Sequence, residues 1–298
     1  MHSEESDSSL PFFPDFDTEY HKHILRVTWF ETDFSQSRYS FKSQPGGSNA
    51  CTIIAILMAW KCHFKDINVK GPDKELNIRL IYALAHSMLE GNDIHNELKK
   101  RGSLYDINLT VPEAIKFSGL AKYGLTEWKS LLFMEPLCDT LHHNIKNTWS
   151  QWVNNPLSKS HPDMYIVLIS DSRSVLFIIQ YAFNTVAVVD SHQHASAGAL
   201  IAITYRQRLQ LLCQWFSEMS EKLYNSHPEV YELSFLYFKN GTDSDFSLSH
   251  SISESVNSNV TPSFNENQSF TTQSRSIDEN SSFEESDGSN IVRSIKSE

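Results

Sequence analysis

The sequence predicts a single α+β domain in which a mainly helical half is followed by an antiparallel sheet. Apolar residues with helical spacing dominate residues 50–153, and after Pro162 the pattern changes to short runs rich in β-branched residues. Turn-length polar or glycine-containing gaps separate these runs, which is typical of an antiparallel meander. The 298 residues are enough for one such core with tails.

Charge and composition divide the chain into three parts. Residues 1–22 carry six acidic residues and one basic residue, and residues 241–298 carry ten acidic and three basic residues. The part between them carries 20 acidic and 21 basic residues. We expect a flexible acidic arm over 1–22, a folded domain over 23–240 and a disordered, Ser/Thr-rich acidic tail over 241–298, because the tail lacks apolar residues for a core. The acidic tails are candidate sites for partner proteins. A nearly neutral domain without clustered basic residues excludes a nucleic-acid partner.

The cysteines and the apolar segments exclude further classes of protein. The four cysteines, at positions 51, 62, 138 and 213, have no metal-ligand spacing, so we expect neither a disulfide scaffold nor a zinc site, and no cofactor. The N-terminal residues lack the pattern of a secretory signal, and no segment reaches the roughly 18 apolar residues of a membrane span. The sequence therefore predicts a soluble intracellular protein, cytoplasmic or nuclear, without a membrane partner.

The individual elements follow from local patterns. The β-branched residues of 23–30 predict a strand, and the dense apolar run of 50–62 predicts a buried helix with Ser48 and Asn49 as caps. The remaining elements are expected as helices over 73–100, 111–117 and 128–153 (broken at Pro136), strands over 164–170, 174–181, 184–192 and 198–204, a helix over 206–224 and a strand over 230–237.

One combination of residues indicates chemistry. Cys51 lies at the start of the predicted helix, where unsatisfied N–H groups and the helix dipole stabilise a thiolate. Asp190 and His192 lie two residues apart at a predicted strand end, so their side chains point the same way. The carboxylate can then bond one ring nitrogen while the other faces the thiol, as nucleophilic catalysis by a cysteine requires.

The order Gln44, Cys51 and Asp190-Ser191-His192, with helices between, resembles that of the papain-like cysteine peptidases, and most closely their deubiquitinating branch. The herpesvirus large tegument protein deubiquitinases share the Asp-x-His arrangement, and Ser48-Asn49-Ala50-Cys51 with its apolar helix is similar to several deubiquitinases. The resemblance implies a papain-like fold and hydrolysis of ubiquitin or ubiquitin-like conjugates.

By the same resemblance, Cys51 would be the nucleophile, His192 the general base and Asp190 its orienting partner. Gln44 would donate to the oxyanion, although its seven-residue distance from Cys51 departs from the papain spacing. Gln36, or backbone groups near 47–51, would be the alternative donors.

Other interpretations remain open at the level of the sequence. Cys51 could be a packed core thiol, and His192 and His194 could be loop histidines. The protein would then be a catalytically inactive binding or scaffold protein that acts through its cleft surface and tails. The sequence Asp-x-His-x-His also occurs in metal-dependent amidohydrolase barrels, but too few residues follow it here to complete such a barrel.

Overall fold

The computed structural model describes residues 10–41, 49–104 and 108–239. The predictions for Gln44, Ser48 and the tail 241–298 lie outside these residues. Within them, the α+β class and the helical half before the meander are confirmed.

The strands are β1 (Phe16–His21), β2 (Leu25–Glu31), β3 (Leu125–Phe133), β4 (Met164–Ser170), β5 (Arg173–Gln180), β6 (Thr185–Asp190), β7 (Ala197–Tyr205) and β8 (Tyr231–Phe238). The α-helices are α1 (Cys51–Phe64), α2 (Ile78–Lys100), α3 (Val111–Ser118), α4 (Leu137–Val153) and α5 (Leu209–Tyr224).

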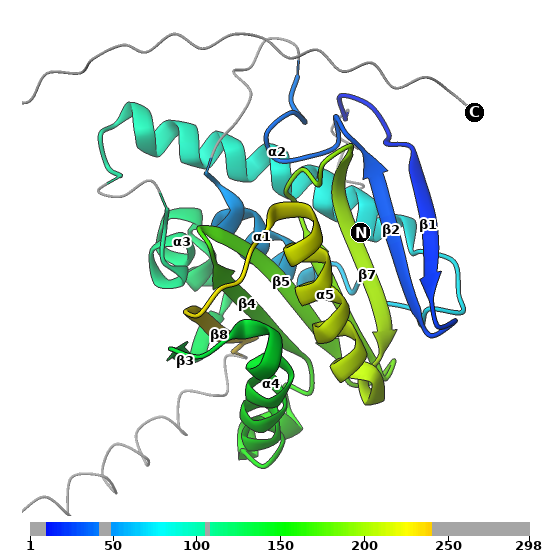
Figure 1. Cartoon of the computed structure of the whole chain (residues 1–298). Helices are drawn as coiled ribbons and strands as arrows, with labels where there is room; N and C mark the ends of the chain where they lie inside the picture. The colour runs from blue at the N-terminus through cyan, green and yellow to red at the C-terminus, as the bar shows by residue number, and fades with distance from the viewer. Residues whose placement is uncertain (1–9, 42–48, 105–107, 240–298) are drawn as a thin grey trace, which may run out of the picture. The chain divides into compact units, whose positions relative to one another are not determined.

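All eight strands form one sheet in the order β1-β2-β7-β6-β5-β4-β8-β3, and each neighbouring pair is antiparallel (Figure 1). The four strands β4 to β7 are the predicted meander, joined by tight turns. This arrangement places β5 and β6 at the centre of the sheet.

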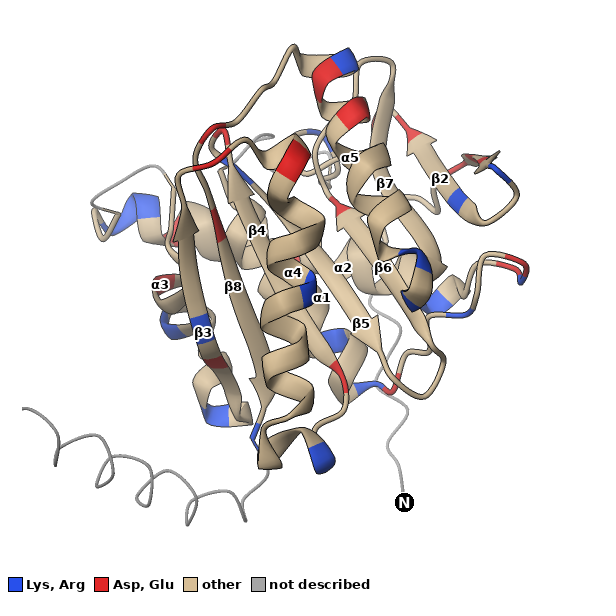
Figure 2. Ribbon diagram, turned by 60° about the horizontal axis from the view of Figure 1, so that its bottom comes forward, with Lys and Arg blue, Asp and Glu red and all other residues tan. Residues whose placement is uncertain are grey.

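Helices cover both faces of the sheet (Figures 1 and 2). α1, α2 and α3 pack on one face, where they share a core with Leu176 and Ile178 of β5. α4 and α5 pack on the other, together with Phe177 and Ile179 of the same strand. Because successive side chains of a strand point to opposite faces, a sheet covered on both sides needs continuous apolar runs. This explains the unbroken apolar segments of the sequence.

The prediction of an unstructured arm over 1–22 is wrong for its last part. Residues 16–21 form β1, which pairs with β2 at the edge of the sheet. The preceding segment also packs on the domain: the Phe12 ring meets Tyr39 with ring centroids 5.0 Å apart, and the Tyr39 hydroxyl donates to the Phe12 carbonyl at 2.8 Å. An edge strand with five of six residues exposed has no buried face, so no alternating apolar pattern marks it.

Two further boundaries differ from the expectation. The predicted helix over 128–153 is a strand, β3, followed by α4, and Pro136 is the N-cap residue of α4 rather than a break inside a helix. α2 begins at Ile78 instead of residue 73, because the Asn77 side chain accepts the Arg79 backbone N–H at 3.1 Å and caps the helix there. Of the helices described, none is long and apolar enough to span a membrane.

Candidate active site

Cys51 is the first residue of α1, and its exposed fraction is 3%. α1 runs between the sheet and the helices α2 and α3, so residues on every side of it are buried and its sequence is apolar all round. Ala50, and not the predicted Asn49, is the N-cap residue, and no described side chain caps this end of the helix. The backbone N–H groups of the first turn of α1 therefore lie beside the thiol without a side-chain cap.

Asp190 ends β6, and the turn that follows carries the histidines. This turn is fastened to the segment after β2, since the Gln36 backbone N–H donates to the Ser191 carbonyl at 2.7 Å and the Ser191 hydroxyl donates to the Gln36 side-chain oxygen at 2.9 Å. Gly198 lies where any Cβ would clash with the carbonyl oxygens of Glu31 and Phe34. The turn thus sits directly on this segment, which fixes the position of its side chains.

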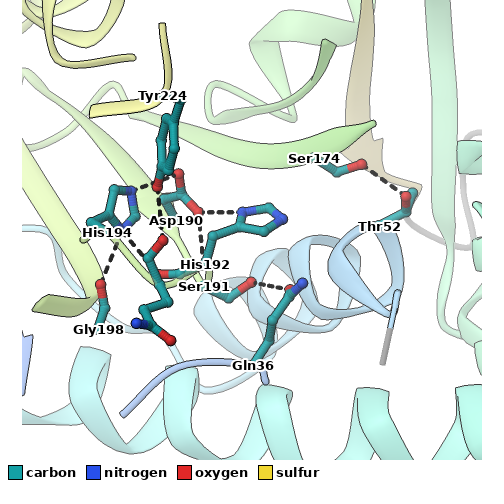
Figure 3. Close-up of polar contacts among 10 residues, drawn as sticks. Gln36, Thr52, Ser174, Asp190, Ser191, His192, His194, Gly198 and Tyr224 are labelled. Atoms are coloured by element: carbon teal, nitrogen blue, oxygen red, sulfur yellow. Dashed lines mark hydrogen bonds and ion pairs between the residues drawn. The ribbon is translucent and has the colours of Figure 1, made fainter. Parts of the chain in front are cut away.

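The structure brings Asp190 and His192 together as the two-residue spacing predicts (Figure 3). The His192 Nδ1–H donates to Asp190 Oδ1 at 2.6 Å, and the His192 backbone N–H donates to the same oxygen at 2.9 Å. The exposed fraction of the Asp190 side chain is 3% and that of His192 is 13%. With Nδ1 held by the carboxylate, Nε2 is the ring nitrogen left for the thiol.

His192 also acts on the Cys51 thiol. Burial raises the pKa of the Cys51 thiol, but the bond and charge of His192, with further bonds from Ser174, outweigh it and hold this pKa below the ordinary thiol value. Burial likewise opposes the charge on His192, yet Asp190 and Cys51 raise the pKa of His192 to about 10. Burial raises the pKa of Asp190, and the two histidines beside it bring it well below its usual range. These directions favour a thiolate–imidazolium pair.

The other three cysteines lack this environment. Burial raises the pKa of Cys62 to about 12 and also raises that of Cys213. Cys138 is exposed on α4, and slight burial and the neighbouring Asp139 raise its pKa. Cys51 is therefore the one thiol of the four whose surroundings favour ionisation.

Ser174, at the start of β5, is a site residue that the sequence does not indicate. Its hydroxyl lies 2.8 Å from the Thr52 hydroxyl, and its side chain and backbone help to lower the pKa of Cys51. β5 passes beneath α1, which brings this serine to the helix start from 122 residues away. A serine near a strand end is common, so its type alone carried no signal.

Gln44, the predicted oxyanion donor, lies outside the described residues. Its alternative, Gln36, is 8% exposed and lies beside Ser191. Because its side-chain oxygen accepts from Ser191, its amide nitrogen points away from that serine and retains its donors (Figure 3).

His194 is a second histidine on Asp190. Its Nε2 lies 3.2 Å from Asp190 Oδ2, the carboxylate oxygen that His192 does not use, and its side chain is fully buried. The sequence suggested a loop histidine, but the ring is buried and bonds to Asp190. Across the described parts of the chain, no group of three or more His, Cys, Asp or Glu side chains is placed to hold a metal ion.

Solved structures similar to this chain include two proteins of low sequence identity. One is the ubiquitin-specific protease encoded by a murine cytomegalovirus tegument protein, in complex with a ubiquitin-based suicide substrate: TM-score 0.44, 15% identity, covering 71% of this chain and 86% of that one. Another is the Pseudomonas avirulence protein AvrPphB: TM-score 0.39, 10% identity, covering 63% of this chain and 91% of that one. No protein-family model matches the chain, and no curated protein matches it.

Proposed function

We propose that the protein is a papain-like cysteine peptidase with Cys51 as nucleophile, His192 as general base and acid, and Asp190 as the residue that orients His192. One arrangement carries this proposal. His192 acts on Cys51, the only one of the four cysteines whose pKa is lowered. The buried carboxylate of Asp190 holds His192 by Nδ1, which leaves Nε2 for the thiol. A core cysteine has no need of such partners, and Cys62 and Cys213 have none of them.

The proposed reaction follows from these positions. The Cys51 thiolate attacks the carbonyl carbon of a peptide or isopeptide bond, forming a C–S bond as the carbonyl electron pair moves to oxygen. The tetrahedral intermediate collapses, the C–N bond breaks, and His192 gives its proton to the departing amine. Water then attacks the thioester while neutral His192 takes one of its protons. The C–S bond breaks, the thiolate and the imidazolium form again, and the product leaves as a carboxylic acid that loses its remaining proton to the solvent.

The oxyanion of this intermediate needs hydrogen-bond donors. We propose that the side-chain amide N–H groups of Gln36, with backbone N–H groups at the start of α1, stand with Gln44 as candidates for this role. Replacement of either glutamine by alanine separates the two candidates. The true donor should lose about 10²–10³ in kcat, and the other should retain activity.

We propose ubiquitin or a ubiquitin-like modifier as the substrate. The support is the resemblance of the residues around Cys51 and of Asp190-Ser191-His192 to deubiquitinases. All four cysteines are free thiols, which fits the intracellular location that we expect, where thiols stay reduced.

The test is exposure of the full chain to ubiquitin that carries a C-terminal thiol-reactive group. We expect a covalent adduct with one ubiquitin that disappears in Cys51→Ser and persists in Cys138→Ser, a matched change at an exposed thiol. The same experiment with other modifiers identifies the substrate if ubiquitin does not react.

A small alkylating reagent tests the proposed peptidase activity separately from the proposed modifier substrate. Rapid alkylation of Cys51 without any modifier adduct would reject the substrate class and keep the peptidase. A Cys51 that reacts no faster than Cys138 would reject the peptidase and favour an inactive binding or scaffold protein.

A further inference from the structure

The strongest unassigned feature of the site is the way His194 is held. The His194 Nδ1 lies 2.9 Å from the His192 carbonyl and 2.9 Å from the Gly198 carbonyl, while Nε2 faces Asp190 Oδ2 (Figure 3). Carbonyl oxygens accept hydrogen bonds and donate none, so Nδ1 must carry a proton. An ionised carboxylate is also only an acceptor, so Nε2 must carry one as well. A ring with both nitrogens protonated is an imidazolium.

The backbone fixes this ring in place. The backbone N–H of His194 donates to the Ala197 carbonyl at 2.8 Å, and the Ala197 N–H donates back at 2.8 Å, which closes a tight turn around Ala195 and Ser196. Ala195 adopts a positive φ of 50° in this turn. Gly198, held against the segment after β2, presents its carbonyl to the ring.

The surroundings contain few other charges. Trp29 of β2 meets the His194 ring edge to face at 5.5 Å, and Tyr224 of α5 lies 5.7 Å away on another side. The Tyr224 hydroxyl donates to the Gln193 carbonyl at 2.9 Å, and the Arg173 guanidinium stacks on its ring at 3.3 Å. Glu19 lies beyond Trp29, whose indole N–H it accepts at 2.8 Å. Of the charged groups in these contacts, Asp190 is the one bonded to the His194 ring.

We propose that His194 is a positioning residue that, as an imidazolium, clamps the second oxygen of Asp190 and keeps this buried carboxylate ionised and correctly turned toward His192. This inference rests on the proposed catalytic function. Each carboxylate oxygen then has its own histidine: Oδ1 binds His192, which faces the thiol, and Oδ2 binds His194, which faces the fold. The positive charge of His194 offsets the free-energy cost of burying the Asp190 carboxylate. Without His194, only His192 would offset this cost, and His192 also pairs with the thiolate.

The first test is the protonation state of wild-type His194, measured by two-bond ¹H–¹⁵N correlation spectra at neutral pH. We expect both ring nitrogens to show the chemical shifts of protonated nitrogen, with the signal assigned by its loss in His194→Gln. One unprotonated nitrogen would overturn the proposal. This measurement does not depend on activity, so it stands whether or not the proposed function is correct.

The second test is the pH profile of Cys51 alkylation in His194→Gln and His194→Phe. Without the His194 charge, Asp190 takes up a proton at higher pH and releases His192, so the acid limb of the profile should move up by about one pH unit. The rate at neutral pH should also fall about tenfold, the loss expected for one hydrogen bond to a charged group.

A matched variant, His143→Gln, changes an exposed histidine of α4 and should leave the profile unchanged. An unshifted acid limb in folded His194→Gln would reject the positioning role while leaving the peptidase intact. Slow alkylation of Cys51 in the wild type would instead reject the peptidase, which keeps the two failures distinct.

Discussion

Asp190→Asn is the most informative change at the site because it keeps the shape of the side chain and removes its charge. The Asp190 carboxylate accepts the His192 ring N–H at 2.6 Å and the His192 backbone N–H at 2.9 Å. An amide oxygen can still accept both bonds. The ring therefore stays oriented, and the experiment isolates the electrostatic contribution of the carboxylate.

The magnitude follows from the pKa of His192. Burial lowers this pKa, and Asp190 and Cys51 raise it to about 10. The thiolate–imidazolium pair exists above the pKa of Cys51 and below that of His192, so it is lost as the pH rises through about 10. Without the carboxylate, the pKa of His192 should fall toward its ordinary value of about 6.5, so the pH at which the imidazolium is lost should move down by at least about two units. Turnover should fall by roughly 10²–10⁴.

The assay is the titration of the His192 ring from about pH 5 to about pH 11, followed by two-bond ¹H–¹⁵N correlation spectra. Asp17→Asn, at an exposed position of β1, is the matched control and should reproduce the wild-type profile. A folded Asp190→Asn protein in which His192 loses its proton at the same pH as in the wild type would show that Asp190 does not hold the charge of His192.

Three further outcomes are expected. Brief alkylation with substoichiometric reagent should label Cys51 ahead of the other three cysteines, and preferential labelling of any of those in a peptide map would remove it as the nucleophile. A chain that ends at Asn240 should stay folded with a melting temperature within about 2 °C of the full chain, since the tail has few apolar residues to bury; a larger drop would show that the tail packs on the domain. Gly198→Ala should lower the free energy of unfolding by roughly 1–3 kcal/mol, because the new methyl group meets the Glu31 and Phe34 carbonyls; an unchanged denaturant midpoint would contradict this.

The parts of the site that could be predicted are those whose pattern is local. The apolar run after Cys51 is long because α1 is buried on all sides, so the helix and its first residue stand out in the sequence. The bond between Asp190 and His192 follows from their two-residue spacing, because in the turn after β6 both the backbone N–H and the ring of His192 reach the Asp190 carboxylate. Both features need no knowledge of the rest of the chain.

The parts that could not be predicted depend on contacts between distant segments. Ser174 reaches Cys51 because β5 passes under α1, and Gln36 reaches Ser191 because the segment after β2 lies against the β6–β7 turn. β1 and β3 were missed for a different reason. Both are edge strands of the sheet with much of their surface exposed, so they lack the continuous apolar runs of the central strands.

Ser191 shows how these two kinds of information combine in one site. It lies between Asp190 and His192 at the start of the turn after β6, and it shares a backbone and a side-chain hydrogen bond with Gln36. Those bonds hold the centre of the three-residue segment, and they therefore fix the residues on both sides of it. The short motif supplies the reacting groups, but the distant contact through its middle residue holds them at a constant position relative to α1.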